Sequence, residues 1–278
     1  MSAPPSYKNL ANVVKDYLTK GSDVCGWQLD ANENDASKGF NAFPFASSKA
    51  IGAHLSYECP SYHTTLKSKV SAAFTSWREY LPTIIYHTKI NNTLSDVEVD
   101  AAAASVKVTA KHSVFNASCK SSPLDGFVTD ANVTTCVSHQ VYAGASLQYD
   151  PKRSGVRDFT AIIVRYACPH IGKGDLLGQY SLWNGVSVHL RIPLHTCMDA
   201  AIMAERRCFI AGVQARSPCG ARLMFNTNVS DGTYTMTAIR NMNDIWKLTL
   251  TMTAPLASGE GAAAPRFGLK LTNMDASD

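Results

Sequence analysis

The second half of the chain contains a series of short apolar stretches separated by turn residues. The clearest stretch carries apolar residues at alternate positions: Trp246, Leu248, Leu250 and Met252. Similar stretches occupy residues 159–168, 186–192, 208–215, 221–226, 234–238 and 267–271. Alternation with a period of two places the apolar side chains on one face of a β-strand. Because no long helical pattern lies between these stretches, they predict a mainly β fold, an antiparallel β-sandwich of the jelly-roll type.

Residues 159–168 differ from the other stretches because their apolar run is nearly continuous. Ile162, Ile163 and Val164 are adjacent and β-branched. A strand that is buried on both faces has this composition. We therefore expect residues 159–168 to form a central, fully covered strand.

Helical spacing predicts two helices in the first 82 residues. Ser6 is a good N-cap, apolar residues recur at helical spacing over residues 10–18, and Gly21 ends this first pattern. Leu66, Val70, Phe74 and Trp77 predict a second helix over residues 64–80. The first helix either docks on a neighbouring subunit or packs on its own domain, and we favour the second alternative. Residues 1–82 are thus predicted to be an N-terminal arm, and residues 83–278 the sandwich domain.

Between these regions the sequence predicts further strands at 83–90, 97–99, 105–110 and 136–143. Val106 and Val108 share one face of the third of these. Residues 21–62 are expected to be mainly loop, with short strands at 25–29 and 53–57, and residues 116–132 are expected to be loop. A further short helix is predicted over residues 196–205.

The composition limits the classes of protein to which the chain could belong. Only 17% of the 278 residues are charged, and the net charge is +4. No run of about 18 apolar residues occurs, so we expect no membrane-spanning helix and no membrane span. The N-terminal residues lack the apolar core of a signal peptide, and the eight cysteines are therefore expected to be reduced.

Catalytic and metal-binding patterns are weak. The close cysteine and histidine pairs are Cys136/His139, Cys168/His170 and His195/Cys197. Their spacings match no zinc module, and residues 172–175 resemble a turn more than a phosphate loop. We expect no enzyme activity, no cofactor and no metal. A β-sandwich enzyme or ligand-binding module with a Cys/His site is kept as an alternative hypothesis.

Basic residues near predicted strand ends form a candidate nucleic-acid interface: Lys152, Arg153, Arg157, Arg206 and Arg207. Arginine side chains suit bidentate contacts to phosphate. The alternative is that these side chains are solvated charges on loops. Aromatic residues do not interleave with them as a base-stacking platform would require.

The leading helix, the few charges, the abundance of Thr, Ser, Asn and Ala, and the predicted sandwich together resemble a family of viral proteins. In style the chain is similar to the jelly-roll coat proteins of small positive-strand RNA viruses. This resemblance covers about residues 83–272. It implies a protein that assembles with copies of itself into a virion shell around single-stranded RNA, in the host cytoplasm. The chain lacks the basic arm that many such coat proteins carry.

A second resemblance is local. Residues 122–126 (SPLDG), 149–150 (YD) and 155–165 (GVRDFTAIIVR) are similar to the middle of bromovirus-type movement proteins. The hallmark aspartate of that superfamily follows an apolar strand, whereas here Lys111 follows the corresponding strand. This resemblance implies a jelly-roll-derived protein that binds single-stranded RNA, and it is the alternative to the coat protein.

Overall fold

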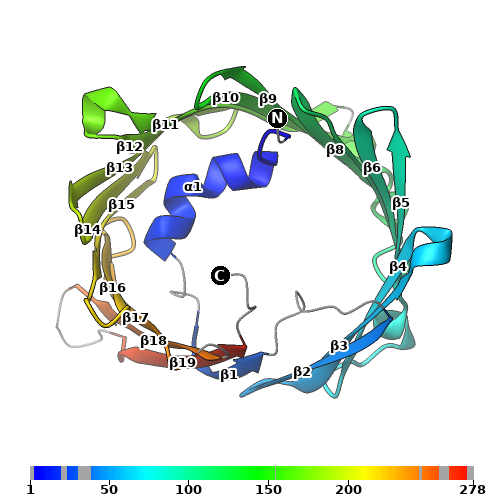
Figure 1. Ribbon diagram of the computed structural model, residues 1–278, viewed down its shortest axis with the longest axis horizontal. Coiled ribbons are helices and arrows are strands. Elements are labelled where there is room, and N and C mark those ends of the chain that lie inside the picture. The colour runs from blue at the N-terminus through cyan, green and yellow to red at the C-terminus, as the bar shows by residue number, and fades with distance from the viewer. Residues whose placement is uncertain are drawn as a thin grey trace.

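The structure is a computed structural model that describes residues 3–19, 24–30, 39–153, 155–243, 246–256 and 263–273. The described strands form one closed 19-stranded β-barrel, and one α-helix lies inside it (Figure 1). The helix α1 spans Tyr7–Thr19. The prediction of a mainly β fold is confirmed.

The strands follow one another around the barrel in chain order. The first ten are β1 (Gly26–Asp30), β2 (Phe40–Ser47), β3 (Ile51–Cys59), β4 (Thr64–Ser71), β5 (Thr83–Ile90), β6 (Thr93–Asp100), β7 (Ser105–Lys111), β8 (Phe115–Ser122), β9 (Val128–Ser138) and β10 (Val141–Asp150). The others are β11 (Gly155–Cys168), β12 (Gly174–Ser181), β13 (Gly185–His195), β14 (Met198–Glu205), β15 (Cys208–Arg216), β16 (Arg222–Asn228), β17 (Thr233–Asn241), β18 (Trp246–Pro255) and β19 (Arg266–Asn273). Short 3-10 turns include η2 (Trp77–Tyr80), η3 (Pro123–Asp125), η4 (Pro151–Arg153) and η5 (Pro169–Ile171).

The barrel closes through a parallel pairing between its first and last strands. Each strand pairs antiparallel with the next, and β1 pairs parallel with β19, Gly26 lying opposite Gly268. An odd number of strands in an up-and-down order necessarily leaves the first and last strands parallel. Closure gives every strand two neighbours, so the wall has no free sheet edge.

The predicted jelly-roll sandwich is wrong, because the strands form a single closed barrel in which only sequence neighbours pair, apart from the closing pair. Alternation of apolar and polar residues defines two faces of a strand, but it does not show whether the apolar face points into a core or outward. The sandwich prediction assigned it to a core. Residues 1–82 contribute β1–β4 to the same wall, and β4 pairs with β5 across residue 82.

The register defines the inner face of every strand. Val164 and Leu177 are buried against Leu10 of α1, so they face the interior. Residues directly opposite each other in a sheet share a face. Val164, Leu177, His189 and Met203 are opposite one another on successive strands, so all four face the interior on β11 to β14. The remaining pairs identify the inward residues of the other strands in the same way.

The first predicted helix is confirmed. The Ser6 hydroxyl accepts a hydrogen bond from the Asn9 backbone N–H at 3.3 Å, as an N-cap does. Leu10, Val14 and Leu18 are fully buried against the wall, so the helix packs on its own barrel. The predicted stop at Gly21 lies outside the described residues.

The second predicted helix is wrong: its residues form β4 and the turn η2. A spacing of four is even, so Leu66 and Val70 share one face of a strand as well as of a helix. The predicted helix at 196–205 is likewise strand β14, whose Ala201 and Met203 pack against α1.

Two other sequence-based predictions are wrong for a related reason. Residues 116–132, predicted to be loop, lie largely in β8 and β9, where polar residues such as Asn116 and Asn132 face the interior. Residues 159–168 lie in β11, which is covered on one face only. Ile162 and Val164 are buried beneath α1, whereas Ile163 is 55% exposed on the outer face.

Candidate functional site: the two faces of the barrel wall

Polar and charged side chains line the inner face, most densely on β5–β9. The register places the following residues inward on β6, β7 and β8: Asp96, Glu98, Asp100, Ser105, Lys107, Thr109, Lys111, Asn116, Ser118 and Lys120. On β9 the inward residues include Asp130, Asn132 and Thr134. The inner wall of this region is thus a polar surface carrying both signs of charge.

Several of these inward charges form cross-strand ion pairs. Lys107 Nζ lies 3.1 Å from Glu98 Oε2, and Lys111 Nζ lies 3.8 Å from Asp96 Oδ2. His87 Nδ1 is 2.8 Å from Asp96 Oδ1. The side chains of Lys107 and Lys111 are 41% and 47% exposed although they point into the barrel. Solvent therefore reaches the interior beside β5–β8, on the side away from α1 (Figure 1).

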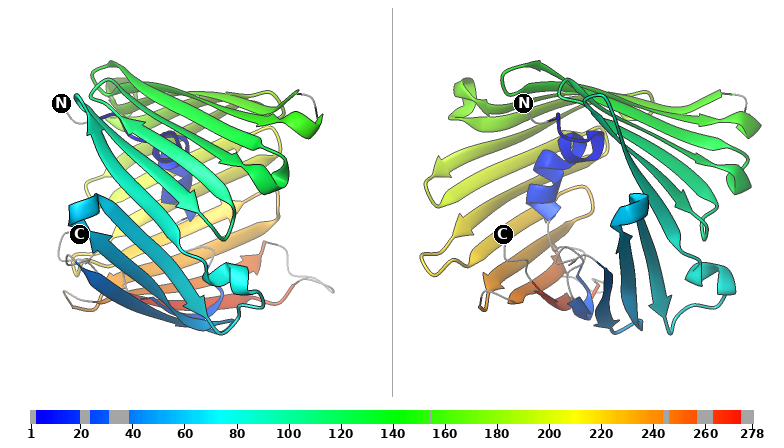
Figure 2. Two further views of the ribbon diagram at one scale, coloured as in Figure 1. Left: turned by 90° about the vertical axis from the view of Figure 1, so that its right-hand side faces the viewer. Right: turned by 45° about the vertical axis from the view of Figure 1, so that its right-hand side comes forward.

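α1 lies against the opposite part of the wall, from β9 to β16. Its N-terminal approach is fixed by two wall residues: Thr134 Oγ1 donates to the Pro5 carbonyl at 2.7 Å, and Asn116 Nδ2 donates to the Pro4 carbonyl at 3.3 Å. At the other end, the Asn226 side-chain amide donates to the Leu18 carbonyl. The helix is thus held along its length inside the barrel (Figure 2).

His189 is the most buried ionisable side chain beneath the helix. It is 2% exposed, and its Nε2 lies 3.2 Å from Glu205 Oε1. Burial lowers the pKa of His189, Glu205 opposes that shift, and Lys15 of α1 adds to the lowering. Burial therefore favours the neutral form of the imidazole, and Lys15 of the helix acts in the same direction.

The tyrosines around α1 are shifted in the opposite sense, because burial disfavours the charged phenolate. Burial raises the pKa of Tyr7, Tyr17 and Tyr166. Tyr17 also donates a hydrogen bond to the Asp199 carbonyl at 3.3 Å, and the guanidinium of Arg191 lies 5.7 Å from its ring centre. Of the three phenols, Tyr17 thus connects the helix to the wall as a hydrogen-bond donor.

The outer face has the opposite character, because apolar side chains occupy it on nearly every strand. Exposed outward residues include Trp27, Leu66, Ile84, Tyr86, Val106, Val108, Leu147, Ile163, Val186, Val188, Phe225, Met236, Leu250, Phe267 and Leu269. By the register, the charged residues at outward positions of the described strands are Arg165 and Arg240, together with Arg157 at a register shift of β11. We call this surface the outer apolar belt.

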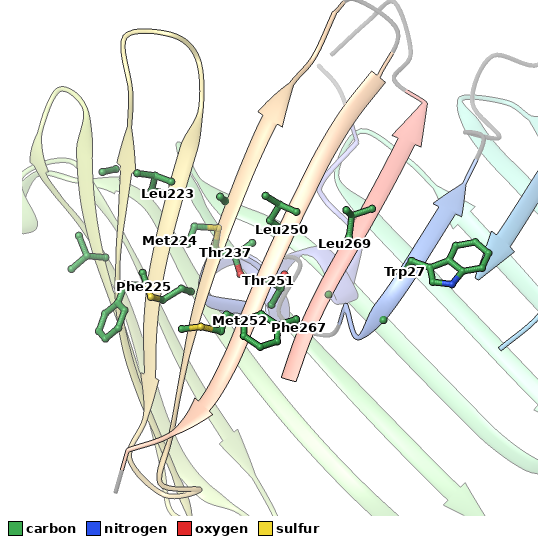
Figure 3. A pocket seen from close by; sticks show the side chains of 16 residues that line it. Trp27, Leu223, Met224, Phe225, Thr237, Leu250, Thr251, Met252, Phe267 and Leu269 are labelled. Atoms are coloured by element: carbon green, nitrogen blue, oxygen red, sulfur yellow. The ribbon is translucent and has the colours of Figure 1, made fainter. Parts of the chain in front are cut away.

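The outer apolar belt is hollowed over β15–β19 and β1. A groove of about 910 Å³ is lined there by side chains that include Trp27, Leu223, Phe225, Leu250 and Leu269 (Figure 3). These residues point outward from neighbouring strands, while α1 lies behind the wall. No charged residue lines the groove, although its lining also includes Met224, Thr237 and Thr251, which the register places on the inner face.

The five residues predicted to bind nucleic acid lie at one rim of the barrel. Lys152 and Arg153 are in the turn η4, Arg157 is near the start of β11, and Arg206 and Arg207 form the β14–β15 turn. Successive strands run in opposite directions, so these two turns are at the same end. The wall brings the residues to one rim but divides them between two turns and the start of β11, and neither turn lies on the inner polar surface.

The inward charges were missed by the sequence interpretation, although a signal for them exists. Around Val106 and Val108, the intervening positions 105, 107, 109 and 111 are Ser, Lys, Thr and Lys. The strand prediction depends on the apolar half of this alternation, whereas the inward charges lie in its polar half. A face made of Ser, Thr, Lys and Asp on consecutive strands indicates a wetted surface.

The cysteine and histidine pairs do not assemble into a metal site. In the described residues no group of three or more His, Cys, Asp or Glu side chains is placed to hold a metal ion. His195 Nδ1 lies 3.2 Å from Cys197 Sγ in an exposed turn. All eight cysteines are free, and Cys168 alone among them is buried.

The chain matches no protein-family model, and comparison with curated protein sequences finds no significant relative. In the part of the chain that the structure describes, no helix has the length and apolar character needed to cross a lipid bilayer.

Proposed function

We propose that this chain is a membrane-spanning β-barrel whose polar interior forms a water-filled pore for small solutes, with α1 lying inside the pore. The observation that carries the proposal is the reversal of polarity across the wall: apolar side chains outside, charged and polar ones inside. In a water-soluble sandwich or barrel the apolar faces point inward to a core. Here that arrangement is inverted around most of the wall.

The backbone of the wall suits a bilayer. In hydrocarbon every peptide N–H and C=O needs a partner within the protein, and a closed sheet satisfies this because it has no edge. Strands of about 9–11 residues are long enough to cross a bilayer at a tilt of about 45°. The strands β9, β10 and β18 have 11, 10 and 10 residues, and most of the others have 7 to 9.

The interior suits a channel. Barrels of about eight strands are filled by their own side chains, whereas those with about 16 or more enclose an aqueous space. Lys107, Glu98 and Lys111 are partly exposed inside this barrel, which supports a wetted interior. The expectation of no membrane span considered helical spans alone, whereas this proposal places strands in the bilayer.

The coat-protein and movement-protein hypotheses remain predictions without a test. Both were based on a jelly roll, and the closed barrel removes that basis. The outer apolar belt would also be exposed to water on the surface of an isolated coat subunit. Sedimentation of the purified protein separates these hypotheses, because shell formation without lipid would favour the coat protein and contradict the pore.

The pore is tested directly by adding the refolded protein to a planar lipid bilayer and recording ionic current. We expect discrete, reproducible conductance steps. Val108→Lys places a charge on the outer face of β7 and is expected to cost about 2–4 kcal/mol of insertion free energy. Thr109→Lys is the matched control, because the next residue along the strand faces the interior. Equal insertion of the two variants, or a protein that never conducts, would contradict the proposal.

A further inference from the structure

The two rims of the barrel carry different turns. Because neighbouring strands are antiparallel, every second turn lies at the same rim, about 10 Å from the next if strands are about 4.8 Å apart. One rim contains the turns at residues 123–127, 151–153, 182–184, 206–207 and 229–232. We call it the basic rim.

Basic and apolar turns alternate along the basic rim. Lys152 and Arg153 occupy one turn, and Arg206 and Arg207 occupy the next but one. The turns between and beside them carry exposed apolar side chains: Leu124, Phe127, Leu182, Trp183 and Val229. Trp183 is 67% exposed and Phe127 is 63% exposed. Over β8–β17 the rim therefore presents exposed apolar groups on three turns and cations on the two turns between them, with Asp231 as an exposed acidic residue in the turn at 229–232.

Contacts between neighbouring turns hold this arrangement. The indole N–H of Trp183 donates to the backbone carbonyl of Arg157, which fixes the ring at the start of β11. The stem of Lys152 lies over the turn at Gly126, so closely that a Cβ there would be 2.2 Å from Lys152 Cε. The cation and the apolar turn beside it thus form a continuous surface.

The opposite rim lacks this pattern over the same strands. Its turns at 139–140, 169–173, 196–197 and 217–221 carry His139, His170, Cys197 and Cys219, with Lys173 as the basic residue. Among the residues of these four described turns, there is no Trp, Phe or Tyr. Over β8–β17 the turns at the two ends of the barrel therefore differ in their apolar and basic residues.

We propose that the basic rim lies at a membrane leaflet rich in anionic lipid headgroups, which it binds through Lys152, Arg206 and Arg207 while Trp183 and its apolar neighbours enter the interfacial layer. This inference is based on the proposed membrane-spanning function and adds the orientation of the barrel and its lipid partner. Aromatic side chains are enriched at membrane–water interfaces, and cations near an anionic leaflet are each favoured about fivefold in partitioning.

An anionic lipid surface explains the rim better than RNA does. Single-stranded nucleic acid is bound by cations together with aromatic rings that stack on bases. Leu124, Leu182 and Val229 cannot stack on bases, but they suit the boundary of acyl chains. The basic rim also continues directly from the outer apolar belt, where a bilayer would end.

Headgroup-specific quenching of tryptophan tests the inference. The full-length protein is reconstituted into phosphatidylcholine vesicles that contain phosphatidylserine, with brominated chains on one lipid or on the other. The part of the quenching that disappears in the Trp183→Phe variant is due to Trp183, and it shows which lipids lie beside that residue. We expect brominated phosphatidylserine to quench Trp183 several-fold more effectively than brominated phosphatidylcholine at equal mole fraction. The preference should decrease at high salt.

Charge variants locate the cause of this preference. The triple variant Lys152→Gln, Arg206→Gln and Arg207→Gln is expected to abolish it. The matched triple variant Arg165→Gln, Lys173→Gln and Arg240→Gln, which removes three charges near the opposite rim, is expected to retain it. Circular dichroism of both variants confirms that the barrel is folded before quenching is compared.

The outcomes separate this inference from the pore. A protein that conducts ions but shows equal quenching by both lipids overturns the anionic-leaflet inference and leaves the pore intact. A protein that neither inserts nor conducts overturns the pore. Salt-sensitive, sequence-independent binding of a single-stranded oligoribonucleotide that the first triple variant loses, without any lipid preference, would assign the rim to RNA.

Discussion

Gly26 lies directly opposite Gly268 in the parallel pairing that closes the barrel. Gly26 has a φ of +72°, a conformation that residues with a Cβ rarely adopt. A Cβ on Gly268 would lie 2.1 Å from the carbonyl oxygen of Val24, in the backbone that leads into β1. Glycine at both positions therefore allows the backbones of β1 and β19 to approach each other closely.

Gly268→Ala is expected to destabilise the closed barrel by about 1–3 kcal/mol, since the Val24 backbone must move away. Gly178→Ala is the matched control, because the nearest atom to its new Cβ, Ile163 Cγ2, would be at an ordinary 3.5 Å. Urea unfolding of both variants in lipid vesicles, followed by tryptophan fluorescence, measures the difference. Equal midpoints would show that closure does not depend on this glycine.

Docking of α1 is expected to weaken below about pH 6.5, because His189 is buried. Burial lowers the pKa of His189 in the docked state. Above the ordinary pKa of histidine, about 6.5, the side chain is neutral in both states and contributes no pH dependence. As the pH falls below that value the undocked state binds a proton that the docked state rejects, so docking loses stability with acidification.

Amide hydrogen exchange in α1, corrected for the intrinsic exchange rate, tests this prediction. It is measured from about pH 5 to about pH 8, the range in which histidine changes its charge. His189→Gln cannot be protonated and should remove the extra acid-induced opening. Glu205→Gln removes the partner that raises the pKa of His189, so the opening should shift to lower pH. The same pH profile in all three proteins would exclude His189 as the group responsible.

The helix itself is expected to depend on Leu10, whose side chain is fully buried against Ile162, Val164 and Leu177. Leu10→Ala should cost about 2–5 kcal/mol of docking free energy, since it leaves a cavity between helix and wall. Lys8→Ala, at an exposed helix position, serves as the control. Susceptibility of α1 to limited proteolysis is the measurement, and equal cleavage rates would mean that the Leu10 contact does not hold the helix.

Particular elements show how far the sequence allows this fold to be predicted. β5 was predicted with its observed bounds, Thr83–Ile90, from its β-prone residues, and β7 and β13 were predicted closely because their apolar residues alternate. β4 was mistaken for a helix, since Leu66 and Val70 fit both periods. β8 and β9 were mistaken for loop, because a wetted inner face makes their sequences polar.

The direction of the apolar face could not be derived from local sequence. Ile162 and Ile163 are chemically alike, yet one is buried under α1 and the other is exposed on the outer face. Which face points inward depends on closure through Gly26 and Gly268, a contact between residues 242 positions apart in the chain. The sequence identified the basic residues at 152–153 and 206–207. That they share one rim follows only from the even number of strands between the two turns.

The pair formed by Glu98 and Lys107 is expected to influence the ion selectivity of the pore. Their charged atoms are 3.1 Å apart on the inner face, where both side chains are partly exposed. Glu98→Gln leaves the charge of Lys107 uncompensated, so the reversal potential in a potassium chloride gradient should shift toward anion preference. Lys107→Gln should shift it toward cations. The double variant retains the wild-type net charge and is expected to restore the wild-type reversal potential.

These shifts should decrease as the salt concentration rises, because the Debye length falls from about 10 Å at 0.1 M to about 3 Å at 1 M. Single-channel recording at several concentrations therefore gives both the sign and the screening of the effect. Shifts of the same sign in both single variants would indicate a change in pore shape. Opposite shifts that cancel in the double variant would place Glu98 and Lys107 on the path of the ions.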